Sequence, residues 1–321
     1  MDPFSQAAFG AAAAQICARK RHYALAITVG ALAGLAPDLD VFIQSNENPL
    51  MGILYHRHFT HSFAFIPVGA LIVAAGLWGL THLWQKLFKI KNRNIPPFKR
   101  LFLFSLIGYA THGMVDALTS YGTVLFWPFS EVRIAWDWVS IIDPLVTFPL
   151  MFGIWFSFRR NAPAPLLLSC TFVAAYIGFL ALWHGRVVNL YEAQLRENGI
   201  VAENLRVMPL LFKPLKYRAV FRMNDEIIIA NIDSPLNGAM VIHPAGAVPH
   251  LDAAAFIEKH PQLSDPIQTY NWFSDGFIGV FKTEPLVLGD FRYGRYDTPL
   301  TPLWAIEVDT QAHTVKPKSM R

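Results

Sequence analysis

The chain has 321 residues, of which 53% are hydrophobic, 14% are aromatic and only 16% are charged, and its mean hydropathy is +0.32. This composition is too apolar for one soluble domain of this length, so it indicates a membrane protein. The net charge of +4 is explained by basic loops between membrane spans, and we expect no nucleic-acid partner. Cys17 and Cys170 both lie in apolar segments, which excludes a disulfide framework.

The first 36 residues predict a short helical hairpin. Two apolar stretches, residues 4–18 and 23–36, are separated by the basic residues 19–22. At about 1.5 Å per residue, each stretch reaches about 22 Å, less than the roughly 30 Å of a bilayer core. We therefore expect two helices that pack against a larger bundle. A cleavable signal peptide fits poorly, because the charges follow the first apolar stretch.

Four later stretches are long and apolar enough to cross a membrane: residues 62–83, 100–121, 139–158 and 164–183. The loops that follow the first and the third stretch are rich in lysine and arginine, so they should be cytoplasmic. Their basic residues are Lys86, Lys89, Lys91, Arg93, Lys99, Arg100, Arg159 and Arg160. The loops at 41–61 and 122–138 should then face the periplasm.

The predicted domains are therefore an α-helical polytopic membrane domain (residues 1–185) and a small α+β soluble domain (residues 186–321) on the periplasmic side. The second domain begins with a predicted helix that runs through Arg196. Five apolar, β-branched or aromatic runs bounded by turn residues then predict strands, at 217–223, 226–232, 277–282, 286–291 and 303–308. This part shows no nucleotide-binding loop and no cluster with metal-ligand spacing.

Ionisable residues at the edges of the apolar stretches, or inside them, indicate the function. An ionisable side chain at membrane depth is costly unless it is paired, hydrated or bound to a metal. In the predicted topology these residues all lie on the periplasmic side. Imidazole and carboxylate together are ligands of zinc and similar ions, although a proton or ion relay uses the same groups. The residues are Asp38, Asp40, His56, His61, His112 and Asp116.

Each motif also has a purely structural alternative. His112 and Asp116 are four residues apart, so they share one helical face and can bind one ion, but they can also form a hydrogen bond within the helix. Asp38 and Asp40 follow Pro37, where they can simply end a helix in water.

Three histidines in residues 56–61 precede the first clear span, and such residues can anchor a helix among lipid headgroups. Arg57 lies among these histidines. Its guanidinium group suits an anionic part of a substrate, because it can hold a phosphate or a carboxylate with two parallel hydrogen bonds.

Several sequence blocks in this order resemble the YdjM-type membrane-bound metal-dependent hydrolases of bacteria: residues 1–6, 34–40, 56–62, 112–116, 120–123 and 143–144. The resemblance covers about the first 160 residues. It implies an inner-membrane helical domain that is distantly similar to zinc-dependent phospholipase C and single-strand nucleases, with metals held by His and Asp among helices. Ser5 and Gln6 stand where many members have Thr and His, and His58 stands where others have Gly.

We therefore predict a membrane-bound metal-dependent hydrolase at the periplasmic face of the inner membrane, with a divalent metal, zinc as first choice, held by the six residues named above. Arg57 would orient an anionic group, while Asp2 and Asp143 would act as general base or orient the ligands. The expected substrate is a lipid-like phosphoester or ester, and the bilayer is the expected partner. One alternative is a proton or divalent-ion transporter or channel, although the sequence lacks the repeats and broken helices of that class. Another is a non-catalytic membrane scaffold.

Overall fold

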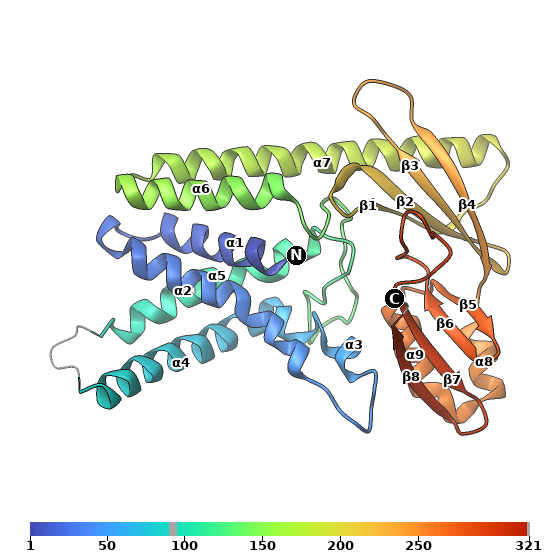
Figure 1. Ribbon diagram of the computed structural model, residues 1–321, viewed down its shortest axis with the longest axis horizontal. Coiled ribbons are helices and arrows are strands. Elements are labelled where there is room, and N and C mark those ends of the chain that lie inside the picture. Colours follow the sequence, from blue (N-terminus) through green and yellow to red (C-terminus); the bar gives the residue numbers. More distant parts are fainter. Residues whose placement is uncertain (90–94, 320–321) are drawn as a thin grey trace. The chain divides into compact units, whose positions relative to one another are not determined.

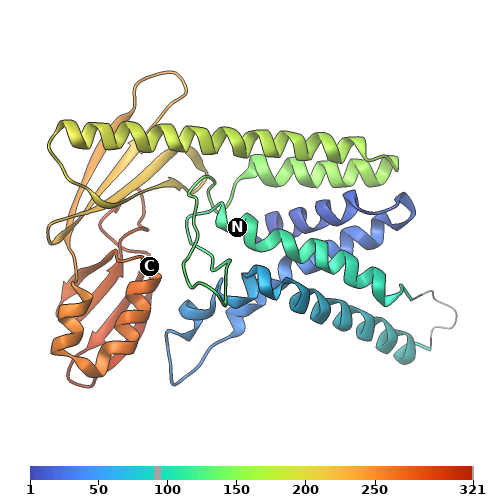
Figure 2. The same ribbon diagram turned by 180° about the vertical axis from the view of Figure 1, so that it is seen from behind.

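The computed structural model describes residues 1–89 and 95–319, which form two compact units. The first unit comprises residues 1–41 and 57–181, and the second comprises residues 42–56 and 182–321. Lys91 and Arg93, which contribute to the topology prediction, lie outside the described residues. Figures 1 and 2 show that the first unit is helical, whereas β-strands dominate the second.

Helices α1, α2 and α5 lie side by side in the first unit, and α4 packs along α5 (Figure 1). Asp2 caps the start of α1 by accepting hydrogen bonds from the backbone of Phe4 and Ser5, and Pro3 occupies the first helical position. The helices are α1 (Pro3–Ile16), α2 (Tyr23–Leu35), α4 (Ile66–Leu87), α5 (Phe98–Ala117), α6 (Pro144–Arg160) and the first part of α7 (Ala164–Glu197).

Glycines bring α1, α2 and α5 unusually close together. A Cβ atom at Gly10 of α1 would collide with the carbonyl oxygen of Gly30 on α2, and a Cβ atom at Gly108 of α5 would collide with the same oxygen. Small residues of this kind let helix backbones approach each other inside a membrane. The close packing sets the spacing between α2 and α5, the two helices that contribute to the site described below.

Among the described residues, three helical segments are long and apolar enough to cross a membrane: Lys20–Phe42, Phe63–Leu87 and Ala164–Glu197. Two of the four expected spans, at 62–83 and 164–183, are therefore confirmed as candidate spans, whereas those at 100–121 and 139–158 are not. The second helix of the hairpin is longer than expected, because 3-10 turns extend α2 at both ends to 23 residues. The stretch at 139–158 forms only the 17-residue α6, and α5 buries polar residues within the bundle.

Two antiparallel four-stranded sheets form most of the second unit, together with α3 (Met51–Tyr55), α8 (Ala253–Lys259) and α9 (Ser264–Phe273). The first sheet has the order β1 (Glu203–Leu210), β2 (Lys213–Met223), β3 (Glu226–Asp233), β4 (Val241–Pro249). The second has the order β5 (Ile278–Thr283), β6 (Leu286–Asp290), β7 (Trp304–Asp309), β8 (Thr314–Ser319).

The five predicted strands are confirmed as β2, β3, β5, β6 and β7, but β1, β4 and β8 were missed. Each missed strand lies at the edge of its sheet and contains proline, such as Pro209, Pro244 and Pro317. Proline lacks the donor that a central strand needs, so these segments read as turns although an edge strand tolerates it.

Helix α7 runs without interruption through residues 183–187, where the sequence analysis separates a span from a following helix. Its later turns present Val187, Tyr191 and Leu195 on one face, because residues four apart align along a helix. These side chains form a core with Phe221 of the first sheet. A second apolar core joins β2 and β3 to Phe277 and other residues beside the second sheet.

Candidate metal centre

Four side chains in the first unit converge on one point: Asp38, His61, His112 and Asp116. Each offers one ligand atom, and the four atoms lie within 4.8 Å of one another. Asp38 lies in the 3-10 turn that follows α2, His61 ends a 3-10 turn just before α4, and the other two lie one turn apart on α5. The two histidines and Asp116 are buried, whereas Asp38 is partly exposed.

The distances between the ligand atoms suit a single small cation. The Nε2 atoms of His61 and His112 are 2.9 Å apart. Asp38 Oδ1 is 3.4 Å from both of these nitrogens, and Asp116 Oδ2 is 3.3 Å from His61 Nε2 and 3.5 Å from His112 Nε2. Ligand atoms on one zinc ion, with bonds of about 2 Å, are at most about 4 Å apart. The donor set and its spacing therefore fit such an ion.

A backbone carbonyl orients His112. Its Nδ1 atom is 2.5 Å from the carbonyl oxygen of Gly34, in the last turn of α2. Carbonyls in the last turn of a helix lack a partner within that helix, so this oxygen is available. Because a carbonyl can only accept a hydrogen bond, Nδ1 is the donor, and the lone pair of Nε2 is directed at the cluster.

Thr60 and Asp40 orient His61 in the same way. The Thr60 hydroxyl donates its hydrogen to Asp40 Oδ2 at 3.0 Å, so it can only accept from His61 Nδ1, which is 3.0 Å away. Asp40 Oδ2 is itself 3.3 Å from His61 Nδ1. Nδ1 therefore carries the hydrogen, and Nε2 faces His112. Asp40, which was predicted as a ligand, lies where a carboxylate can hold a ligand histidine in place, and its carboxylate is also a possible metal ligand.

The two imidazoles thus present lone pairs to each other across 2.9 Å, with carboxylates on either side. Such an arrangement is repulsive unless a cation or an extra proton lies between the nitrogens. Asp116 Oδ2 is buried and, among the described residues, receives no hydrogen bond, although Arg57 Nε lies 3.1 Å away. A cation at the common point would therefore stabilise the cluster.

Arg57 borders the cluster and is 6% exposed. Besides its ion pair with Asp116, its Nη1 atom donates to Thr119 at 3.1 Å and its guanidinium lies over the ring of Tyr121. The residue has a φ of +62°, a conformation that is uncommon outside glycine and often retained at functional sites. Its backbone NH donates to Asp40 Oδ2 at 2.9 Å, which stabilises this conformation.

Gln6, which stands where many YdjM-type proteins have His, contributes to the site although the sequence did not predict it. The Gln6 amide nitrogen donates to Asp116 Oδ1 at 2.7 Å, and the Met1 amino group contacts the same oxygen. Gln6 is fully buried. The signal in the sequence that could have indicated its role is the position of a polar amide within an apolar helix. Gly113 was also missed: it lets the His61 backbone approach α5, because a Cβ atom there would collide with the His61 carbonyl.

The remaining predicted site residues lie outside the four-residue cluster. Asp2 caps α1, and Asp143 caps α6 and accepts a hydrogen bond from Tyr176 at 3.0 Å. His56 caps the end of α3 and belongs to the second unit. Burial lowers the pKa of the His58 imidazole, which favours the neutral ring.

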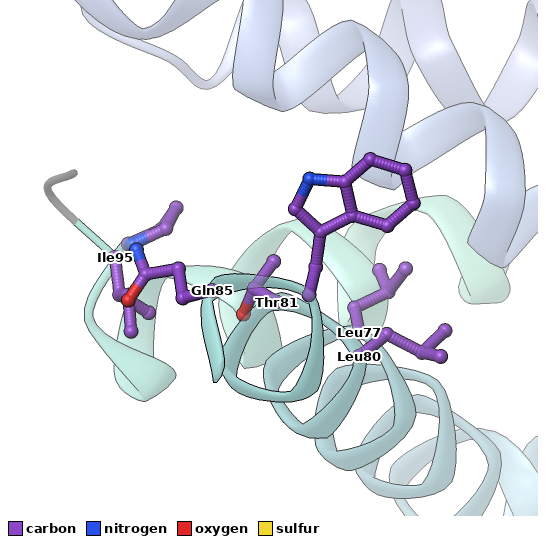
Figure 3. A pocket seen from close by; sticks show the side chains of 7 residues that line it. Leu77, Leu80, Thr81, Gln85 and Ile95 are labelled. Carbon is purple, nitrogen blue, oxygen red and sulfur yellow. The ribbon is translucent and has the colours of Figure 1, made fainter. Parts of the chain in front are cut away.

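A hollow of about 360 Å³ lies between α4 and the residues just before α5 (Figure 3). Its lining includes Leu77, Leu80 and Ile95, with Thr81 and Gln85 as polar members. None of these residues is a candidate metal ligand, so the hollow is separate from the chemistry of the cluster.

A family model described as YdjM inner membrane protein matches residues 1–187, and the chain belongs to this family. It is therefore an inner membrane protein with several apolar helices. The chain is 27% identical over 194 residues to the uncharacterized protein YfhP of Bacillus subtilis (strain 168). The alignment covers 60% of this chain and 54%, about half, of that relative. No solved structure matches the chain.

Proposed function

We propose that this protein is a metal-dependent hydrolase of the inner membrane. The main support is the convergence of Asp38, His61, His112 and Asp116 on one point, with both imidazole Nε2 atoms directed there. Simple packing of polar residues in a membrane bundle does not require that arrangement.

Zinc is the first choice for the metal, because imidazole nitrogens and carboxylate oxygens are both among its protein ligands. When bound, the ion would lower the pKa of a water ligand to about 7 and polarise the oxygen of an ester or phosphoester. The protein's own residues prepare the site: Asp40 and the Gly34 carbonyl hold the ligand histidines in one tautomer and orientation.

Arg57 gives the proposed site a preference for an anionic substrate. Its Nε atom compensates Asp116, and its Nη1 atom is held by Thr119, which fixes the plane of the guanidinium. A planar guanidinium fixed in this way can hold a phosphate or carboxylate through its remaining donors. We therefore propose a phosphoester or ester of a lipid-like molecule as substrate. Asp143 remains the proposed general base, and Asp2, whose carboxylate caps α1, is the alternative.

The proposed location of the site is the periplasmic face, with the second unit on the same side. The support is the concentration of Lys and Arg in the loops after α4 and α6. Reporter fusions after Arg160 should report the cytoplasm, and fusions at the C-terminus should report the periplasm. A cytoplasmic C-terminus would move the site to the other face.

The decisive test replaces His112 by alanine in the full-length, detergent-purified protein. Metal content measured by mass spectrometry should fall from a stoichiometric level to background, together with hydrolysis of a chromogenic phosphoester or ester probe. His243→Ala is the matched control, because His243 is half exposed in the second unit and pairs only loosely with Asp233, at 3.7 Å. Full metal content and activity in a folded His112→Ala variant would contradict the proposal.

A further inference from the structure

A second feature of the first unit is an apolar groove of about 230 Å³ between α1, α5, α6 and α7. Small and aliphatic side chains predominate in its lining. The residues are Phe9, Ala12, Ala13, Ile16, Thr111, Leu150, Cys170, Val173, Ala174 and Ile177.

Polar contacts hold α1 and α6 together on both sides of this groove. Near the start of both helices, the hydroxyl of Ser5 contacts that of Thr147. Ten residues further along each helix, the Gln15 amide nitrogen donates to Ser157 Oγ at 3.2 Å. The equal offset means that the two helices run parallel, and the groove residue Leu150 lies on α6 between the two contacts.

The groove offers almost nothing to a polar ligand. Its one hydroxyl, on Thr111, already donates to the Gly108 carbonyl at 2.8 Å, and no charged side chain lines it. A cavity of this kind favours hydrocarbon over water. One wall is α7, a candidate membrane span whose exposed residues include Ala174. In an inner membrane protein the hydrocarbon that surrounds such a span is the acyl chain of a phospholipid.

The groove begins close to the metal cluster. Phe9 is three residues, about 4.5 Å of helix rise, from Gln6, and the two residues lie on neighbouring parts of one helical face. Gln6 donates to Asp116 of the cluster. On α5, the groove residue Thr111 directly precedes the candidate ligand His112. The end of the groove at Phe9 and Thr111 is therefore the end from which we expect a headgroup to approach the cluster.

We propose that this groove binds one acyl chain of a membrane phospholipid and so presents the headgroup ester to the metal cluster. The presentation step rests on the proposed hydrolase function. Binding of the chain does not, because it depends on the shape and apolar lining of the groove alone. The substrate class is then a phospholipid of the bilayer rather than a soluble phosphoester.

The test uses the full-length protein in nanodiscs that contain a phosphatidylglycerol with a photoreactive diazirine in one acyl chain. Crosslinks mapped by peptide mass spectrometry should concentrate on the groove segments 9–16 and 170–177. Ala174→Trp, which fills the groove, should reduce this crosslinking at least fivefold. Ala175→Trp is the matched control, since Ala175 is also exposed on α7 but does not line the groove; it should leave crosslinking unchanged.

Equal crosslinking in the two tryptophan variants, or crosslinks spread evenly over all exposed helix faces, would overturn the proposal. So would protein–protein crosslinks showing that a second copy covers the groove. His112→Ala separates this idea from the proposed function: it should retain wild-type crosslinking while it loses metal. Loss of groove crosslinking in the tryptophan variant with metal content intact would establish the groove even if no hydrolysis were found.

Discussion

Each unit buries charged side chains, but the two units neutralise them in different ways. In the second unit, Arg292 is fully buried, and its donors are all directed at acceptors of the protein. Nε and Nη2 bond to Asp290, Nη2 also to the Phe273 carbonyl, and Nη1 to Asp275. In the first unit, the ligand atoms of the cluster are acceptors directed at one another.

The comparison shows that a buried charge alone does not indicate a functional site. The group around Arg292 is complete, because two cations, Arg292 and Arg206, meet the carboxylates of Asp290 and Asp275, so its role is structural. In the cluster of His61, His112 and the two aspartates, by contrast, four ligand atoms face one common point. Convergence of ligand atoms, rather than burial of charge, is the feature that points to a ligand.

The largest expected effect is on the complete network. Arg292→Leu should destabilise the second unit by about 3–5 kcal/mol, because it leaves the carboxylate of Asp290 buried without a cation. Chemical denaturation of the purified protein, followed by tryptophan fluorescence, would measure this change. Arg295→Ala is the control: Arg295 is exposed, and its contact with Asp297 at 3.9 Å should contribute less than about 0.5 kcal/mol. Similar losses in both variants would mean that the network is not what stabilises the unit.

A smaller effect is expected when the residue that orients a ligand histidine is changed but the histidine itself is kept. Asp40→Asn should weaken metal binding about 10–100-fold, because an amide cannot hold His61 Nδ1 as a carboxylate does. Calorimetric titration of the metal-free protein with zinc would measure the affinity. Glu47→Gln, which removes an exposed carboxylate, should leave it unchanged. Unaltered affinity in the Asp40 variant would remove Asp40 from the site.

Arg57→Lys tests whether geometry or charge matters beside the cluster. Lysine keeps the positive charge near Asp116 but loses the planar fork, so metal content should remain while KM for an anionic probe rises about tenfold. Steady-state kinetics with an anionic and a neutral ester probe would separate an effect on anion recognition from a general effect on activity. An equal change for both probes would argue against anion recognition by Arg57.

The smallest effect is expected at Asp2. Asparagine caps helices about as well as aspartate does, so Asp2→Asn should change stability by less than about 0.5 kcal/mol and leave activity near that of the wild type. If Asp2 instead serves as the general base, the same variant should lose about 100-fold or more in kcat. Activity and thermal unfolding of one preparation decide between capping and catalysis.

Much of the fold could be predicted from local patterns. Long apolar runs predicted the helices of the first unit, and alternation of β-branched and aromatic residues predicted the central strands. The edge strands could not be predicted, because proline at Pro244 or Pro317 is tolerated only where one side of a strand has no neighbour. Two of the four expected spans are not confirmed as candidate spans, because α6 is short and α5 buries polar residues inside the bundle.

The sequence by itself determined which residue types are available for a site and that His112 and Asp116 share a face, since helix periodicity is a local property. It also placed costly ionisable groups beside apolar segments. Only the tertiary structure decided that Asp38 and His61 join them, that Asp40 lies beside His61 Nδ1, and that Gln6 contacts Asp116. These contacts join segments that are far apart in the sequence, so no short-range pattern predicts them. They depend on the close packing of backbones at Gly30 and Gly113.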